Sequence, residues 1–199
     1  MKNIIEHYDK LIEENNDPVH DPYPLKEYMD KWDGDLFIEN LHLQKDKSVL
    51  EIGVGTGRLA IRVAPLCGSF LGIDISPKTI NRASDNLSSF DSVTLICDDF
   101  MSFEFYEKFD IIYSSLTFMH IEDKRFAIKK IASLLNNEGR FVLSIDKNQS
   151  GFIDMGMRRV KIYPDNPIDI YNYLLEAKLD LTAQFETEHA YVMIAIKPS

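Results

Sequence analysis

From residue 48 onward the sequence alternates between short apolar runs and longer segments in which apolar residues recur at helical spacing. Residues 121–135, for example, have the pattern of an amphipathic helix. The apolar runs have the length of buried strands and occupy residues 48–52, 70–75, 93–97, 109–113 and 140–145. Strands that alternate with helices form parallel sheets covered by helices. The sequence therefore predicts an α/β fold with a doubly wound, mostly parallel sheet and helices on both faces.

The C-terminal end departs from this alternation. Residues 179–186 and 191–196 are two runs rich in strand formers, and only a short polar turn around Glu188 and His189 separates them. A connection this short joins antiparallel strands. We therefore expect the sheet to end in an antiparallel hairpin.

Two segments lie outside the strand pattern. Residues 1–47 are predicted to form an N-terminal helical cap or lid, and residues 48–199 form the core of what is a single domain overall. In the cap, an apolar helical face is followed by a proline-rich turn and a second helix at 25–41. The other segment, 148–167, contains a basic cluster with two interpretations, a solvated strand edge or a contact for an anionic substrate. The cluster consists of Arg158, Arg159 and Lys161.

The first apolar run leads into three alternating glycines, Val49-Leu50-Glu51-Ile52-Gly53-Val54-Gly55-Thr56-Gly57-Arg58. Glycine adopts positive φ and lets the backbone approach a ligand closely, so this loop is typical of a nucleotide-binding turn. A dinucleotide fingerprint, G-x-G-x-x-G, would need glycine at position 58, where this chain has arginine. The glycines follow the register E-x-G-x-G-x-G instead. The chain also lacks the phosphate-binding motif G-x-x-x-x-G-K-[ST].

This register, together with the terminal hairpin, resembles the class I S-adenosylmethionine-dependent methyltransferases, in particular their small-molecule type, whose sheet has seven strands. The resemblance implies that S-adenosylmethionine is the cofactor and S-adenosylhomocysteine the product. It assigns Asp74, followed by Ile75, to the ribose diol at the end of the second strand. Capping of the next helix is the alternative role of Asp74, although Ser76 and Pro77 already form a helix start.

The same resemblance implies the remaining cofactor contacts. Asp98 or Asp99 would accept from the adenine amine, with Asp98 preferred, and Phe100 would form an apolar wall. Ser114 and Ser115 would lie near the methionine amino group. Glu51, in contrast, is expected to brace the glycine loop by accepting backbone N–H groups. The expected cofactor-binding residues are Glu51, Gly53, Gly55, Thr56, Gly57, Asp74, Ile75, Asp98, Asp99, Phe100, Ser114 and Ser115.

Methyl transfer depends mainly on positioning, and a base is needed only where the acceptor carries its proton at neutral pH. His120 follows the fourth strand and is the candidate catalytic residue, with helix-start packing or cofactor contact as alternatives. In the cap, His20 and Tyr23 are favoured for substrate contact, whereas a core face explains Tyr8 and Tyr28. The candidate substrate or lid residues are Tyr8, His20, Tyr23 and Trp32.

The composition of the chain limits its domain count, its location and the classes of partner it can bind. The chain has 199 residues, of which 45% are hydrophobic, and this suits one core. A net charge of −10 disfavours nucleic acid and anionic membranes. The charged N-terminus and the absence of a long apolar run predict a cytoplasmic protein without a membrane span. Cys67 and Cys97 are expected to be inert core thiols, and the five scattered histidines predict no metal site.

Two other function classes share these motifs. A non-catalytic partner subunit that binds S-adenosylmethionine or S-adenosylhomocysteine would have the same cofactor residues. A nicotinamide-dependent oxidoreductase shares the strand, loop and acid, but the glycine register and the hairpin argue against it. The run Ser114-Ser115-Leu116-Thr117 stands where an Asn-Pro-Pro-Tyr-type amino-methylation motif would be, so O-, N- and S-methylation of a small molecule stay open. A monomer or a homodimer is expected.

Overall fold

A computed structural model describes residues 2–155 and 158–199 of the chain. In these residues, seven strands form one sheet in the order β3-β2-β1-β4-β5-β9-β8. The strands are β1 (Ser48–Ile52), β2 (Ser69–Asp74), β3 (Val93–Cys97), β4 (Phe109–Ser115), β5 (Leu135–Asp146), β8 (Asp180–Glu186) and β9 (Ala190–Ile196). Neighbours from β3 to β5 pair in parallel, whereas β9 is antiparallel to both β5 and β8. The predicted sheet and its C-terminal hairpin are confirmed.

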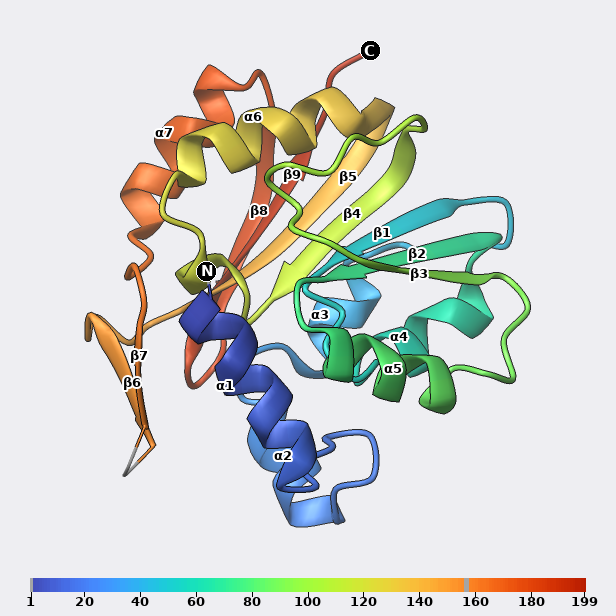
Figure 1. Cartoon of the computed structure of the whole chain (residues 1–199). Coiled ribbons are helices and arrows are strands. Elements are labelled where there is room, and N and C mark those ends of the chain that lie inside the picture. The colour runs from blue at the N-terminus through green and yellow to red at the C-terminus, as the bar shows by residue number, and fades with distance from the viewer. Residues whose placement is uncertain (1, 156–157) are drawn as a thin grey trace.

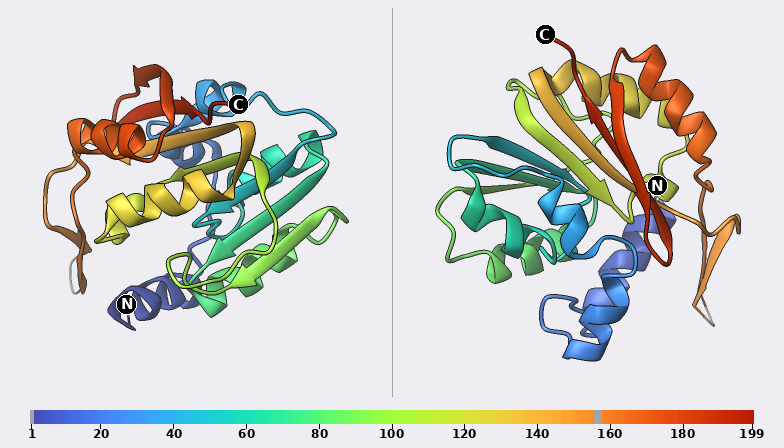
Figure 2. Two further views of the ribbon diagram at one scale, coloured as in Figure 1. Left: turned by 90° about the horizontal axis from the view of Figure 1, so that it is seen from above. Right: turned by 180° about the vertical axis from the view of Figure 1, so that it is seen from behind.

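Helices cover both faces of the sheet (Figure 1 and Figure 2). One face carries α3 (Gly34–Glu39), α4 (Ala60–Val63), the short 3-10 helix η1 (Ala64–Leu66) and α5 (Pro77–Asn86), and the other carries α6 (Lys124–Leu134) and α7 (Pro167–Glu176). Successive strand residues pack into different clusters: Val49 and Ile111 belong to the first face, Leu50 and Ile112 to the second. Both faces are therefore buried, which explains the continuous apolar runs of the parallel strands.

Local capping sets the helix starts. Ser76 accepts a hydrogen bond from the Thr79 backbone N–H and Pro77 is the first residue of α5, as predicted. Helix α6 begins later than the predicted residue 121, because Asp123 accepts from the Phe126 backbone N–H and fixes the start at Lys124. A 3-10 helix, η2 (Phe118–His120), precedes it.

Helix α6 ends at Leu134 and β5 already begins at Leu135, so this strand is longer than the predicted run at 140–145. Leu135 pairs with Phe109 of β4, and the backbone of Glu138 and Gly139 bonds to Lys197 after β9. The register between β4 and β5 shifts between Phe109 and Ile111, so residues 136–139 form an irregularity in this ladder, and the backbone of Lys197 holds them in the sheet although their sequence is typical of a loop.

The N-terminal segment contains α1 (Lys2–Glu13) and α2 (Tyr23–Met29) in addition to α3. The prediction of a single helix at 25–41 is wrong, because the helical structure is interrupted between α2 and α3. Asp33 caps α3 by accepting from the Gly34 backbone N–H at 2.7 Å, and Gly34 has a φ of +67°. Phe37 and Leu41 are fully buried in the core cluster of the first face. The segment therefore does not lie wholly outside the core.

Two short strands, β6 (Phe152–Met155) and β7 (Arg158–Lys161), form a separate antiparallel hairpin that extends from the body of the molecule (Figure 1). The predicted basic cluster lies on β7. The guanidinium of Arg159 lies 3.8 Å from the ring centre of Phe152, and Lys161 Nζ lies 4.5 Å from that of Tyr163. Residues 156 and 157 of this predicted segment lie outside the described residues.

The two cysteines differ in exposure. Cys67 is buried as expected, but Cys97 is exposed, so its assignment to the core is wrong. Cys97 ends β3, which lies at one edge of the sheet and is not enclosed by a further strand. In the part of the chain that the structure describes, no helix is both long and apolar enough to cross a membrane.

Candidate cofactor and acceptor site

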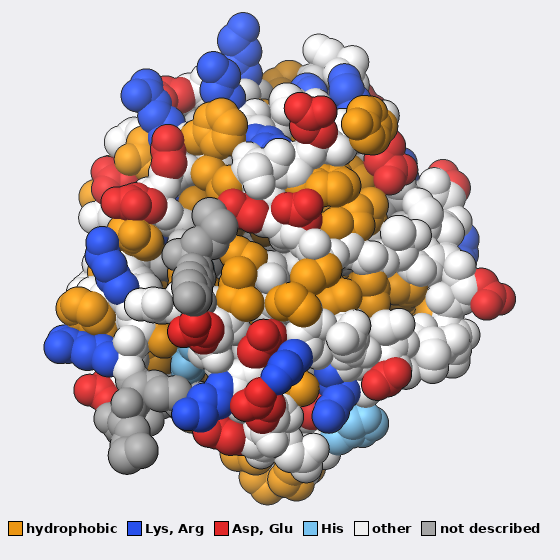
Figure 3. All heavy atoms as spheres, viewed as in Figure 1, with side chains coloured by type: hydrophobic (Ala, Val, Ile, Leu, Met, Phe, Trp, Pro, Cys, Tyr) orange, Lys and Arg blue, Asp and Glu red, His pale blue; other side chains and the backbone are white. Residues whose placement is uncertain are grey.

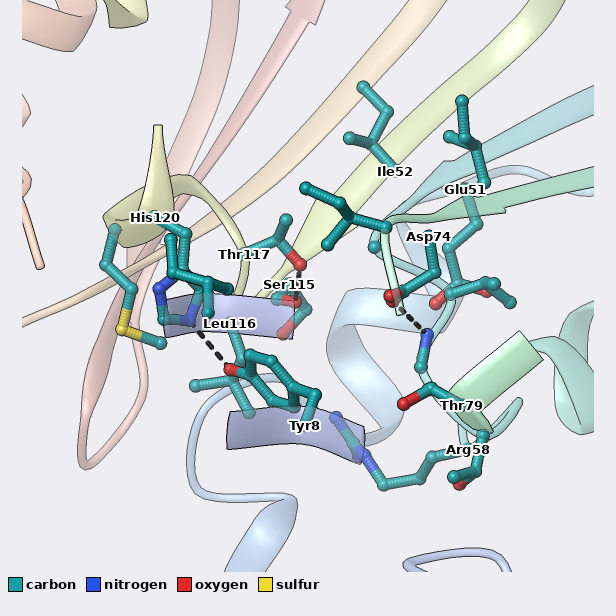
Figure 4. A pocket seen from close by; sticks show the side chains of 18 of the residues that line it. Tyr8, Glu51, Ile52, Arg58, Asp74, Thr79, Ser115, Leu116, Thr117 and His120 are labelled. Carbon is teal, nitrogen blue, oxygen red and sulfur yellow. Dashed lines mark hydrogen bonds between the residues drawn. The ribbon is translucent and has the colours of Figure 1, made fainter. Parts of the chain in front are cut away.

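A pocket of about 730 Å³ opens where β1, β2 and β4 end. Ile52, Asp74 and Ser115 line it from these strand ends. Its other side is formed by α1 and α2, which contribute Tyr8 and Tyr28 among other residues. The carboxyl ends of the strands are where open α/β sheets bind ligands. Figure 4 shows Tyr8 and His120 on one side of this pocket and Asp74 and Glu51 on the other.

The glycine loop has the conformation that its sequence predicts. Gly53, Gly55 and Gly57 all have positive φ, of +77°, +57° and +95°. A Cβ on Gly53 would collide with Thr117, whereas a Cβ on Gly55 would meet nothing within 4 Å. Gly53 therefore permits close packing of β1 against the segment after β4, and Gly55 leaves the loop open toward the pocket. Gly57 packs near Leu87 and is outside the pocket lining.

Asp74 braces the loop. Its Oδ2 accepts from the Gly55 backbone N–H at 3.0 Å, and its Oδ1 accepts from the Ser76 backbone N–H at 3.0 Å. Burial raises the pKa of Asp74, against the lowering effect of these hydrogen bonds. The carboxylate still lines the pocket, followed by Ile75.

Glu51 has a different environment from the one predicted. Glu51 was expected to accept from the loop backbone, but its Oε2 accepts from the Tyr113 hydroxyl at 2.7 Å. The side chain is almost completely buried, and burial raises the pKa of Glu51 to about 8. Glu51 lines the pocket, and Asp74 performs the bracing.

The strand-three acids lie at the pocket as predicted, and Thr56 lines it too. Asp98 accepts from the Asp99 backbone N–H at 2.7 Å, and Asp99 accepts from the Met101 backbone N–H at 3.0 Å. Asp98 is the more exposed of the two. Phe100 is buried behind them and provides apolar surface.

The two serines at the end of β4 have different environments. Ser114 is fully buried, donates to the Ile52 carbonyl at 2.8 Å and is outside the pocket lining. Ser115 lines the pocket and donates to Asp33 Oδ2 at 2.7 Å. Asp33 also binds the guanidinium of Arg58, which lines the pocket. The sequence did not predict a role for Asp33, and it distinguished Arg58 only as a departure from a dinucleotide motif.

Tyr8 and His120 form a hydrogen-bonded pair between α1 and η2. The Tyr8 hydroxyl lies 2.7 Å from His120 Nε2. Burial, with nearby His7 and Lys124, lowers the pKa of His120 to about 4, so the imidazole is neutral at neutral pH. Burial and the charge of Asp74 raise the pKa of Tyr8 above its usual value. Among the described residues, His120 Nδ1 is buried without a hydrogen-bond partner.

The other lid candidates lie elsewhere. His20 Nε2 is 3.0 Å from Asn86 Oδ1 at an exposed position, and the Tyr23 side chain is 76% exposed. Trp32 donates to Asp146 Oδ2 at 3.1 Å. None of the three lines the pocket, whereas Tyr8 and Tyr28 do. The geometry therefore reverses the preference for His20 and Tyr23 over Tyr8 and Tyr28. In the described part of the chain, no group of His, Cys, Asp and Glu is arranged to hold a metal ion.

Residues 43–170 match the family described as a methyltransferase domain. The match covers more than half of the chain and includes the glycine loop, the strand-end acids and His120. The chain therefore belongs to this methyltransferase family.

A curated relative, malonyl-[acyl-carrier protein] O-methyltransferase of Anoxybacillus flavithermus, is 32% identical over 100 residues, which are 49% of this chain and 38% of the relative. The chain thus spans less than half the length of this relative. Among solved structures, the N-methyltransferase NodS of Bradyrhizobium japonicum with S-adenosylhomocysteine has a TM-score of 0.74 at 18% identity and covers 99% of this chain and 100% of its own. The [4+2]-cyclase SpnF has a TM-score of 0.69 at 18% identity, with 82% and 80% covered. These two likenesses show the fold alone.

Proposed function

We propose that this chain is an S-adenosylmethionine-dependent methyltransferase that methylates a small-molecule acceptor. The observation that carries the proposal is one pocket in which the open glycine loop and Asp74 face the Tyr8–His120 pair (Figure 4). Membership of the methyltransferase family supports it. The bound S-adenosylhomocysteine of NodS supports the choice of cofactor for this fold.

The loop suits a ligand without phosphate. A phosphate cradle needs free backbone N–H groups, but the Gly55 N–H already donates to Asp74. The same carboxylate would repel a pyrophosphate beside the loop. Both features favour S-adenosylmethionine over a nicotinamide dinucleotide.

We assign the cofactor contacts to groups that line this half of the pocket. Each Asp74 oxygen accepts one backbone N–H and has further lone pairs for the ribose hydroxyls. Asp98 or Asp99 would accept from the adenine amine, and Phe100 supplies the apolar wall next to them. Gly55 lets the ligand approach the backbone closely.

When bound, S-adenosylmethionine supplies an electrophilic methyl group, so the protein needs mainly to orient the acceptor and exclude water. Tyr8 and His120 are the polar groups proposed for this orientation. A neutral imidazole with a pKa of about 4 is a weak base, and its Nε2 is paired with Tyr8, so we assign His120 to holding the Tyr8 hydroxyl in place for the acceptor rather than to abstraction of a proton from an alcohol. An acceptor whose nucleophilic atom has no proton to lose at neutral pH would need no base from this pair.

The charge of the chain bears on which class of molecule it can bind. Figure 3 shows acidic side chains next to hydrophobic ones on the face seen in Figure 1. A chain with a net charge of −10 repels nucleic acid over long range. We therefore propose a small-molecule acceptor and a chain that acts as a monomer or homodimer, without nucleic acid.

The named substrate of the curated relative, malonyl-[acyl-carrier protein], is not adopted for this chain. Among the described lining residues, Arg58 is the one Lys or Arg side chain, and it directly follows the glycine loop that is assigned to the cofactor. A free carboxylate on the acceptor would have no second cation to pair with.

The proposal is tested with S-adenosylmethionine that carries an isotope-labelled methyl group, incubated with the protein and a mixed metabolite extract. Mass spectrometry should find a labelled small molecule and S-adenosylhomocysteine in equal amounts. A heat-inactivated sample is the control. Tight cofactor binding without any labelled product would support the non-catalytic binder instead.

A further inference from the structure

Arg58 is fixed in one position within the pocket. Its Nη1 donates to Asp33 Oδ1 at 3.0 Å and its Nη2 donates to Asp33 Oδ2, so the two planar groups meet edge to edge. The Arg58 side chain is only 17% exposed. It directly follows Gly57, the last glycine of the loop that approaches the ligand.

Asp33 is itself rigidly held. Its side chain is completely buried and also accepts from the Gly34 backbone N–H and from Ser115 Oγ, each at 2.7 Å. Three segments therefore meet here: the N-terminal segment, the glycine loop and the end of β4. Because this carboxylate holds the Arg58 guanidinium, Arg58 loses little conformational freedom when it binds a ligand, and this favours affinity.

The guanidinium has donors left for a ligand. Arginine carries five N–H donors, and hydrogen bonds among the described residues account for the two that bind Asp33. Burial lowers the pKa of Arg58, but the hydrogen bonds and charge of Asp33 raise it above the usual value, so the group is always charged. A fixed, charged guanidinium is suited to a planar carboxylate.

We propose that Arg58 binds the carboxylate of the methionine half of S-adenosylmethionine, and that Asp33 is the positioning residue that aims the guanidinium. The inference rests on the proposed function. That carboxylate is the one anionic group of the cofactor, and Arg58 is the one Lys or Arg among the described lining residues. The methionine half also carries an ammonium group, so the carboxylates of Asp33 and Asp30 beside Arg58 match a zwitterion rather than repel it.

The test uses two probes that differ only in this half of the molecule. S-adenosylhomocysteine has the amino-acid group, whereas 5′-methylthioadenosine keeps the adenosine and the sulfur but lacks it. For Arg58→Gln we expect the dissociation constant of S-adenosylhomocysteine to rise about tenfold to a hundredfold, the size of a lost hydrogen bond to a charged group. The dissociation constant of 5′-methylthioadenosine should change less than about twofold, because this probe has no carboxylate. Isothermal calorimetry measures both.

Arg62→Gln is the matched control, because Arg62 lies one helical turn further on, pairs with the exposed Asp35 and does not line the pocket. It should leave both affinities unchanged. Asp33→Asn keeps the oxygen that accepts from the Gly34 N–H and turns an NH2 donor toward the Ser115 hydroxyl, which can accept. It removes the charge that binds Arg58, and it should weaken only S-adenosylhomocysteine. An Arg58→Gln protein that loses both probes equally, or neither, would overturn the assignment. If the unchanged protein binds neither probe, the proposed function itself fails.

Discussion

At the scale of single residues, burial determines the chemistry of this site more than residue type does. Glu51 and Asp74 are both strand-end acids, yet Glu51 bonds to Tyr113 whereas Asp74 bonds to the backbone of the loop. Glu51 is 3% exposed, so its charged form is strongly disfavoured. A buried acid of this kind makes stability depend on pH.

Glu51→Gln should therefore change the pH dependence of stability. The pKa of Glu51 is about 8 in the folded protein and 4.5 as its ordinary value, so the folded state favours the protonated form. The stability that this gives is complete below pH 4.5 and is lost as the pH rises through 8. Glutamine does not ionise, so the variant should match the melting temperature of the unchanged protein near pH 4 and exceed it near pH 9. A constant difference between the two at every pH would contradict the assignment.

Asp74→Ala should weaken both S-adenosylhomocysteine and 5′-methylthioadenosine, because both probes carry the ribose. We expect a loss of about 1.5–3 kcal/mol, the range for a charge-assisted hydrogen bond. Calorimetry measures it, and circular dichroism checks that the variant is folded. Asp91→Ala, an exposed change outside the pocket, is the control. Unchanged affinity in a folded Asp74→Ala protein would remove Asp74 from the site.

The sequence predicted the loop glycines and strand-end acids because each follows an apolar strand at a fixed spacing. It did not predict Asp33, since its partners Arg58 and Ser115 lie 25 and 82 residues further along the chain. The Tyr113 hydroxyl that binds Glu51 lies 62 residues away. Such contacts depend on how the strands are ordered in the sheet, which local spacing does not encode.

At the scale of elements, α1 is a docked wall of the pocket. Its Asp9 accepts from Ser76 Oγ at 2.7 Å and from the Lys78 backbone N–H at 3.1 Å, which fixes the helix against the start of α5. Tyr8 is the neighbouring residue and reaches His120 from this wall. Asp9 thus anchors the helix on the side of Asp74 and α5, and Tyr8 contributes its hydroxyl on the side of His120.

Tyr8→Phe should separate these two contributions. The phenyl ring keeps the wall, but the hydrogen bond to the buried His120 is lost. We expect the rate of methyl transfer to fall about tenfold, the effect of about 1.4 kcal/mol. The affinity for S-adenosylhomocysteine should stay within about twofold, because the hydroxyl has no assigned cofactor contact. A parallel fall in affinity and turnover would mean that Tyr8 belongs to the cofactor pocket.

A second anchor holds η2 from the other side. Lys124 Nζ donates to the carbonyls of Phe118, Ile121 and Tyr163 and forms an ion pair of 3.0 Å with Asp165. The Asp165 side chain is 1% exposed. This arrangement ties the segment after β7 to the turn that carries the acceptor-side histidine.

Asp165→Ala should leave the buried Lys124 without its counter-ion and lower the free energy of unfolding by about 3–5 kcal/mol. Urea denaturation measures the loss. The matched control is Glu176→Ala, which breaks the exposed pair with Arg125 and should cost less than about 1 kcal/mol. Equal losses in the two variants would show that the buried pair has no special role.

The elements that the sequence predicted well are those with a clear period or cap, such as β1, β3 and α5. The break before α3 was missed because it depends on the positive φ of Gly34 and the capping carboxylate of Asp33, inside an otherwise helical pattern. The extension of β5 was missed because backbone bonds to Lys197 override the loop preference of its residues.

At the scale of the whole molecule, the fold class could be predicted, because alternating runs and a terminal hairpin allow few topologies. The division at residue 47 stays a proposal, and the burial of Phe37 and Leu41 joins part of the N-terminal segment to the core. What unites the molecule functionally is one pocket that draws on both parts.

The central claim is that this pocket binds S-adenosylmethionine, and calorimetric titration of the full chain tests it most directly. The protein is titrated with S-adenosylmethionine, S-adenosylhomocysteine and NAD under the same conditions. The account predicts micromolar binding of the first two, about 8 kcal/mol at 25 °C, and no measurable heat with NAD. Tight binding of NAD without any response to S-adenosylhomocysteine would contradict it.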